Sequence, residues 1–392
     1  MKHTTHSILL LAAILAHGVR TYGQGFSSGS TGADGALDVT SDQTLDLPPD
    51  GIFNFTTINV AAGTTLRFNR NALNTPVYLL ATGDVTIGGR IDVSGSPGTP
   101  GLPLGGSGGP GGFDGGVPAV GGLAPGAGLG PGAGLGGDQN TSTTGAGAGS
   151  YSSSSPFPRP NNGTPYGSPL LVSLVGGSGG GGTTGSTPVP GSGGGGAILV
   201  ASSTVITVGA SGRVTAEGGE NTTYWWYNSG SGGAIRLVAP VVSGNGVLSV
   251  YGGPTYKQGG AGRVRIDSLD RTSLVLNVQP PGSLSLGSLM MVFPTPNPRL
   301  DVVDAAGTAV AEGTPGPVQV LLPFGTSPDQ TITVQARDFD ASVPIRVVLT
   351  PAGGAPVSYD ATIDNVGSNP ASTTVNVTFP VNTVVQVNAW TH

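Results

Sequence analysis

The chain has 392 residues, of which 71 are glycine and 33 are proline, with a formal net charge of −6 and no cysteine. Its 37% hydrophobic content is enough to build a core, which excludes a generically disordered chain, and the lack of cysteine excludes disulfides and thiolate chemistry. Nucleic acid is not expected as a partner, because phosphate binding needs clustered cations and Lys257 is the one lysine after residue 23.

Residues 1–23 have the features of a secretory signal peptide. Lys2 precedes the apolar run 8–16, and a short polar stretch allows cleavage near Gly23. The apolar run is too short to span a bilayer, and no later segment is apolar over the roughly 18 residues that a span needs. We therefore expect a mature chain with no transmembrane span that is secreted or held at the cell surface. An uncleaved membrane anchor is the alternative.

Three later segments share one pattern: 77–95 (VYLLATGDVTIGGRIDVSG), 197–219 (AILVASSTVITVGASGRVTAEGG) and 235–253 (IRLVAPVVSGNGVLSVYGG). Each has an apolar strand, a turn, a second strand that alternates, and then glycine. Alternation with valine, isoleucine and threonine predicts strands. A two-strand unit cannot cover its own apolar face, so such units have to stack. We predict an all-β chain with a parallel β-solenoid over 24–286.

Alternation also assigns faces to these strands. Alignment on the shared alanine puts the following residues of the first strands inside: Leu79, Ala81, Leu199, Ala201, Ile235, Leu237 and Ala239. It leaves four apolar side chains outside that need a cover: Tyr78, Leu80, Ile198 and Val200. In the second strands the inward residues are Ile91, Val93, Val214, Ala216, Leu248 and Val250, and a shorter copy adds Val264 and Ile266.

A segment rich in glycine and proline, about 96–190, interrupts the repeats. It lacks a strict Gly-x-y period and so is not collagen-like. Two alternatives stay open: a disordered insert, or short polyproline II pieces lying against the solenoid wall. The glycines that begin each unit predict a corner with positive φ and close backbone approach, in preference to a flexible linker.

The residue pattern of the sequence changes again after about Leu286. Residues 287–299 read as a linker, and 300–392 contain about seven short alternating runs separated by turn signals. This pattern predicts a C-terminal β-sandwich of the immunoglobulin or fibronectin III type, without a disulfide.

The segment 55–87 (FTTINVAAGTTLRFNRNALNTPVYLLATGDVTI), the glycine-rich insert and 230–240 (GSGGAIRLVAP) together resemble glycine-rich exported bacterial proteins of unknown function. The resemblance covers Asp34 to about Asp267. More distantly, the stacked units are similar to the right-handed parallel β-helix of pectate-lyase-like proteins and surface adhesins. That likeness implies a right-handed coil, but the fold hosts lyases, hydrolases and inert scaffolds alike.

No catalytic residues, metal site or cofactor are expected. Three of the four histidines lie in the signal segment, which leaves His392 and removes any His-based triad or zinc site within one chain. The best lyase-like sets are charged: Asp84, Arg90 and Asp92, or Asp267, Asp270, Arg263, Arg265 and Arg271. We interpret them as a solvated charge ladder on the outer wall, in which Arg90 and Arg213 are neighbours.

One surface feature suggests binding. Tyr224, Trp225, Trp226 and Tyr227 lie between polar turns and cannot all face a core, so a glycan or a partner protein could contact them. The alternative is a loop that folds back onto the solenoid end.

These features favour a secreted or cell-surface structural or adhesive protein that presents a rigid β-solenoid surface and does no catalysis. Its expected partners are an extracellular polysaccharide, a surface matrix or copies of itself. The alternative is a polysaccharide-binding or lyase-like β-helix protein, and an ice-binding or filament-forming surface is a third possibility.

Overall fold

The computed structural model describes residues 25–139, 143–220, 228–253, 259–314, 318–339, 341–352 and 356–391. Within these ranges the regular structure is 24 β-strands and one short 3₁₀ turn, η1 (Pro281–Ser283), so the prediction of an all-β chain is confirmed. No helix in the described ranges is long and apolar enough to cross a membrane.

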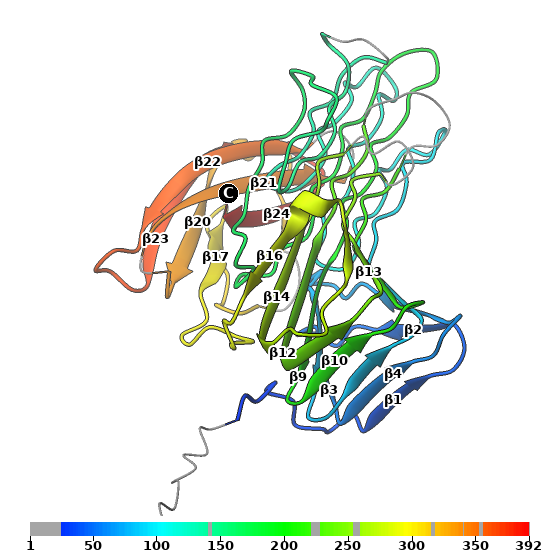
Figure 1. Cartoon of the computed structure of the whole chain (residues 1–392). Coiled ribbons are helices and arrows are strands. Elements are labelled where there is room, and N and C mark those ends of the chain that lie inside the picture. Colours follow the sequence, from blue (N-terminus) through cyan, green and yellow to red (C-terminus); the bar gives the residue numbers. More distant parts are fainter. Residues whose placement is uncertain are drawn as a thin grey trace, which may run out of the picture.

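The first part of the chain forms three parallel ladders, in which strands far apart in sequence are direct neighbours (Figure 1). One ladder contains β3 (Ile52–Phe55), β6 (Val77–Ala81), β9 (Ala197–Ser202), the start of β12 (Ala234–Gly244), β14 (Arg263–Asp270) and β16 (Leu284–Gly287). The second contains β1 (Ala36–Val39), β4 (Thr57–Val60), β7 (Val85–Ile87), β10 (Val205–Val208) and the end of β12. The third contains β2 (Gln43–Asp46), β5 (Thr65–Asn69), β8 (Arg90–Asp92), β11 (Arg213–Thr215), β13 (Val247–Ser249) and β15 (Asn277–Gln279).

A single apolar cluster fills the space that the three ladders share. The inward residues predicted for the second strands all belong to it: Ile91, Val93, Val214, Ala216, Leu248 and Val250. Val264 and Ile266 also belong to it, but they lie on β14, which pairs with the first strand β12 and is not a further second strand. Alternation along the second strands is regular, because the inward residues are apolar and pack in the shared core, whereas the outward residues are charged or polar.

The prediction for β9 is wrong by one residue. In the structure Val200 pairs with both Leu79 and Leu237 and lies in the shared core, whereas Leu199 lies beside Tyr78 and Arg236 on the outer face. A shift of one position exchanges the two faces of a strand, so Ile198 and Val200 face inward and Leu199 and Ala201 outward.

The outer face of the first ladder is covered, as expected from the apolar residues that point outward from it. Leu80, Leu199 and Val238 pack in a second cluster with side chains from the glycine-rich insert and from the segment after β16. The covering residues that are themselves buried are Tyr151, Leu171, Leu174 and Val292. Tyr78 packs against Phe293, with ring centroids 5.1 Å apart and the rings inclined by 47°.

The glycine-rich segments form a layered assembly of extended runs, which we call the glycine bundle (upper part of Figure 1). Its runs are 93–98, 105–109, 111–119, 125–130, 132–138, 145–151, 161–163, 176–183, 189–196, 215–220, 228–233, 250–253 and 259–262. They connect by backbone hydrogen bonds that recur every third residue. Phe113, Gly116 and Ala119 donate to the carbonyls of Gly177, Gly180 and Thr183 at 2.8–3.0 Å.

A three-residue repeat without ladder pairing is the geometry of polyproline II chains, whose hydrogen bonds go to neighbouring chains. Run 176–183 bonds to six other runs, namely 111–119, 125–130, 132–138, 145–151, 189–196 and 228–233, and so lies at the centre of the bundle. Of the two alternatives for the insert, the extended, ordered one describes the structure. The runs pack mainly on one another rather than on the sheet wall.

Glycine is needed in the bundle because a side chain would not fit. A Cβ on Gly181 would lie 2.0 Å from the carbonyl oxygen of Leu135, and one on Gly182 only 1.8 Å from that of Val117. The glycines that lead into β9 and β12 do not have positive φ, so that half of the corner prediction is wrong. The predicted close backbone approach is confirmed.

The last part of the chain forms two antiparallel four-stranded sheets around a separate core. One sheet has the order β18 (Thr308–Ala309), β17 (Arg299–Ala305), β20 (Asp329–Arg337) and β23 (Ala371–Thr378). The other has the order β19 (Val318–Leu321), β24 (Val384–Thr391), β21 (Ser342–Pro351) and β22 (Val357–Asp364).

The outer face of the second sheet lies against the glycine bundle (Figure 1). Trp390 on β24 contacts Phe113 of run 111–119, with ring centroids 5.2 Å apart. Val348 on β21 is 1% exposed although it does not belong to the core between the two sheets. The bundle is therefore held from below by the parallel ladders and from one side by this sheet.

Candidate functional site

The loops of the glycine bundle gather at the end that points away from the parallel strands. Run 93–98 continues outward from β8 and run 189–196 returns to β9, so the chain between the runs turns at the far end. Loops 99–104, 119–125 and 184–188 lie there, and we call this region the bundle tip (Figure 1). The amide of Ala119 donates to the carbonyl of Thr183, which places the second and third loops side by side.

The three loops of the bundle tip expose apolar side chains and carry no charge. The most exposed of its large apolar side chains are Leu102, Leu104, Val120 and Leu123, with 54%, 70%, 52% and 58% of their surface accessible. None of the residues in the three loops is charged. A shallow groove of about 480 Å³ runs between loops 119–125 and 184–188. Exposed apolar residues gathered on an ordered support are typical of contact surfaces.

The aromatic patch predicted from the sequence, Tyr224, Trp225, Trp226 and Tyr227, lies outside the described residues. The residues on either side of that segment belong to the bundle. Asn228 is fully buried, and its side-chain amide donates to the carbonyls of Gly181 and Pro190 at 3.0 and 3.2 Å. Glu220 is also buried.

The predicted charge ladder follows the third ladder of strands. Arg90 and Arg213 are direct neighbours, as predicted, with Asp92 3.1 Å from Arg90 and Glu217 3.5 Å from Arg213. Thr215 donates to Asp92 at 2.8 Å. Because each carboxylate is bound to a cation or a hydroxyl, the row compensates its own charge.

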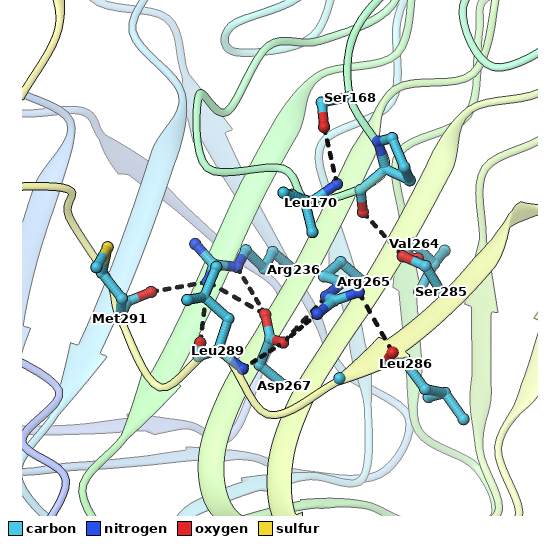
Figure 2. Close-up of polar contacts among 12 residues, drawn as sticks. Ser168, Leu170, Arg236, Val264, Arg265, Asp267, Ser285, Leu286, Leu289 and Met291 are labelled. Carbon is cyan, nitrogen blue, oxygen red and sulfur yellow. Dashed lines mark hydrogen bonds and ion pairs between the residues drawn. The ribbon is translucent and has the colours of Figure 1, made fainter.

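In the second charged set, Asp267 and Arg265 belong to a buried cluster, so the interpretation as a solvated wall is wrong for these two residues, whereas Asp270 and Arg271 are exposed. Asp267 on β14 and Arg236 on β12 have 0% exposed side chains and lie 3.1 Å apart (Figure 2). Arg265 donates to the other carboxylate oxygen at 2.7 Å. Segment 288–293 closes over them, because the amide of Leu289 donates to Asp267 and Arg236 donates to the carbonyl of Met291.

This arrangement can clamp the chain but leaves the carboxylate no free position. Both oxygens of Asp267 accept charged donors, and one also accepts the Leu289 amide. Burial lowers the pKa of Arg236, and the adjacent Asp267 opposes that shift. The remaining candidates also have structural contacts. Asp84 accepts from Thr204, and Arg271 donates to the carbonyl of Gly287.

Arg263 packs over Tyr151 at 5.4 Å from the ring centroid and donates to the carbonyl of Tyr166 at 2.8 Å. Burial raises the pKa of both tyrosines well above 10, so their hydroxyls stay neutral. Asp270 is exposed, and hydrogen bonds from Thr272 lower its pKa. Across the described ranges, no group of three or more His, Cys, Asp or Glu residues could hold a metal ion.

Sequence reasoning missed the bundle tip. Its described loops have no charged or aromatic residue, so they carry none of the side chains that identify a site from sequence. Comparison of the chain with protein-family models, curated proteins and solved structures gave no match.

Proposed function

We propose that this chain is a secreted or cell-surface adhesive protein whose rigid glycine bundle presents an apolar tip to an extracellular polysaccharide or surface matrix. In this proposal the parallel ladders form a right-handed β-solenoid over 24–286, and 300–392 form a β-sandwich module of the immunoglobulin or fibronectin III type that braces the bundle. The observation that carries the proposal is the bundle itself, with its loops collected at one end.

Three features support an adhesive role. The bundle consists of runs whose backbone groups bond to one another, which makes a stiff support for loops that would otherwise be mobile. The tip loops combine exposed leucine and valine with no charge. The ladders below anchor the runs, since β9, β12 and β14 each begin where a run ends.

No catalysis is part of the proposal. Within the charged sets that a lyase would need, Asp92 is paired with Arg90 and Asp267 with Arg236 and Arg265, and the buried Asp267 has no accessible oxygen. A lyase would release products with new unsaturated ends, which absorb in the ultraviolet. Incubation with pectin and alginate is expected to release none.

The test is adsorption of the mature chain to insoluble polysaccharides and to isolated cell-surface material. The variant L102S/L104S/V120S/L123S removes the apolar side chains of the tip. The matched control L269S/V275S removes two equally exposed apolar side chains that lie outside the bundle. We expect adsorption to fall at least tenfold in the tip variant and to stay unchanged in the control. Equal adsorption by both variants would refute the assignment of the tip.

A further inference from the structure

A second concave site lies where the glycine bundle meets the C-terminal sheets. This cleft, which we call the junction cleft, has a volume of about 470 Å³ and shares no lining residue with the groove at the bundle tip. It is lined by Phe113 from the bundle, by Arg70 and Asn74 from the connection between β5 and β6, and on its sheet side by Gln386, Asn388 and Trp390. The volume is in the range of about 300–1,000 Å³ that is usual for small-molecule sites.

Alternation along β24 directs three side chains toward this cleft. Val385 and Val387 point into the core between the two sheets. Gln386, Asn388 and Trp390 therefore lie on the opposite face, at intervals of about 6.6 Å along the strand. The row offers two amides and an indole on a strand that is paired on both sides, so its backbone is fixed.

The aromatic part of the cleft has two faces. Trp390 and Phe113 have their ring centroids 5.2 Å apart and are inclined by 57°, and both side chains remain partly exposed. Two inclined rings form a corner that can receive the apolar face of a sugar ring, which combines C–H groups with hydroxyls at its rim.

The polar part of the cleft has free amides and no unpaired charge. The side chains of Gln386 and Asn388 make no hydrogen bond with the rest of the described chain, so their donors and acceptors are available. Arg70 forms an ion pair with Asp114 and donates to the carbonyl of Gly108. Asp301 accepts from Arg299 and from the amide of Gly313.

These observations decide the class of ligand. An anionic polymer needs an uncompensated cation, and the charged residues that line the cleft are already compensated within the protein. Amides next to aromatic faces suit hydroxyl groups instead. We propose that the junction cleft binds an uncharged saccharide, with Trp390 and Phe113 against the sugar ring and the amides of Gln386 and Asn388 bonded to its hydroxyls.

Isothermal titration calorimetry of the mature chain tests this proposal. The neutral probes are cellohexaose, xylohexaose and mannohexaose, and the acidic probe is hexagalacturonate. We expect at least one neutral probe to bind and the acidic probe to bind at least tenfold more weakly. The variant Q386A/N388A loses two amide hydrogen bonds and is expected to bind about tenfold more weakly.

The variant keeps its fold because neither side chain bonds to the described chain, and circular dichroism checks this. Asn376→Ala removes an exposed amide on β23, away from the cleft, and is the matched control. The proposal is overturned if no neutral probe binds, if hexagalacturonate binds as tightly, or if Q386A/N388A binds as the control does. Adsorption through the bundle tip is measured separately and does not depend on any of these outcomes.

Discussion

Substitution of a central glycine tests whether close backbone approach holds the bundle together. In Gly180→Ala the new Cβ would lie 2.0 Å from the carbonyl oxygen and 2.5 Å from the carbonyl carbon of Asn228. The φ of Gly180 is not positive, so alanine brings no dihedral strain and the cost is steric. To reach ordinary contact, run 228–233 has to withdraw from run 176–183 by more than about 1 Å.

The size of the effect follows from what that displacement breaks. Overpacking costs about 1–3 kcal/mol. The withdrawal also strains the bond from the amide of Ser192 to the carbonyl of Asn228 and the bonds from the Asn228 amide to Gly181 and Pro190. At about 1 kcal/mol for each bond, and with partial relaxation, the total is about 3–5 kcal/mol.

Hydrogen exchange measured by mass spectrometry reports this loss at the bundle. We expect the amides of 176–183 to exchange at least about 100-fold faster in Gly180→Ala, since 3 kcal/mol corresponds to slightly more than two powers of ten. Gly282→Ala is the control, because a Cβ there would meet nothing within 4 Å and the φ of Gly282 is ordinary. If Gly180→Ala exchanged at the same rate as Gly282→Ala, the account of the bundle would be refuted.

Three further predictions concern the buried ion pairs of Asp267, the ionisation of Tyr78 and the burial of Val200 on β9. Asp267→Asn leaves two arginines buried without their counter-ion and is expected to destabilise the protein by about 3–5 kcal/mol in urea unfolding, whereas Asp360→Asn, which removes an exposed partner of Arg346, should cost less than about 1 kcal/mol; equal midpoints would contradict the clamp. Burial raises the pKa of Tyr78 to about 12, so the folded state binds a proton that the unfolded state releases near pH 10, and the stability this provides is complete below pH 10 and is lost as the pH rises toward 12. Ultraviolet titration of the folded protein should therefore show Tyr78 ionising about two pH units later than in Tyr-containing peptides, which Tyr78→Phe would remove, and ionisation near pH 10 would refute its burial. Val200→Asp should abolish folding, because it places a carboxylate in the core shared by the ladders, and a well-folded Val200→Asp would contradict the burial of Val200 in that core.

The second strands could be predicted from sequence because their two faces differ chemically. Along 90–93 and 213–216, charged or polar residues alternate with apolar ones, and the structure has the same faces. The neighbouring positions of Arg90 and Arg213 followed from the same alignment, although 122 residues separate them.

The strand β9 could not be assigned in this way. All six of its residues are buried, since one face meets the shared core and the other is covered by Tyr151, Leu171 and Leu174. A strand that is apolar on both faces has no alternation, so the alignment depended on a shared alanine and selected the wrong register. The buried salt bridge escaped prediction for a related reason: the covering segment 288–293 is not adjacent in sequence to Arg236.

The sequence contains a weak three-residue period that corresponds to the runs of the bundle. In 105–113, GGSGGPGGF, a residue other than glycine stands at every third position. That period is what three residues per turn requires when two of three positions face other runs and one faces outward. Elsewhere in the insert the period is interrupted, and glycine has no side chain from which to read a face.

The ladders and the bundle share one geometric requirement, which explains why such different segments follow one another in each turn of the chain. Adjacent parallel strands are about 4.8 Å apart, and the runs that leave β11 and β13 stay bonded at the same interval: Ala216 donates to Ser249 at 2.9 Å and Gly218 to Tyr251 at 2.8 Å. On the return path Gly232 donates to Gly260 at 2.9 Å before β12 and β14 begin. Strands keep this spacing to their neighbours within the sheet, and their side chains fill the space above and below it. Runs that have neighbours on every side have no such space for side chains. Glycine is therefore required where a run has neighbours on every side. The length of each excursion into the bundle is free to vary, because only the spacing at its two ends is fixed.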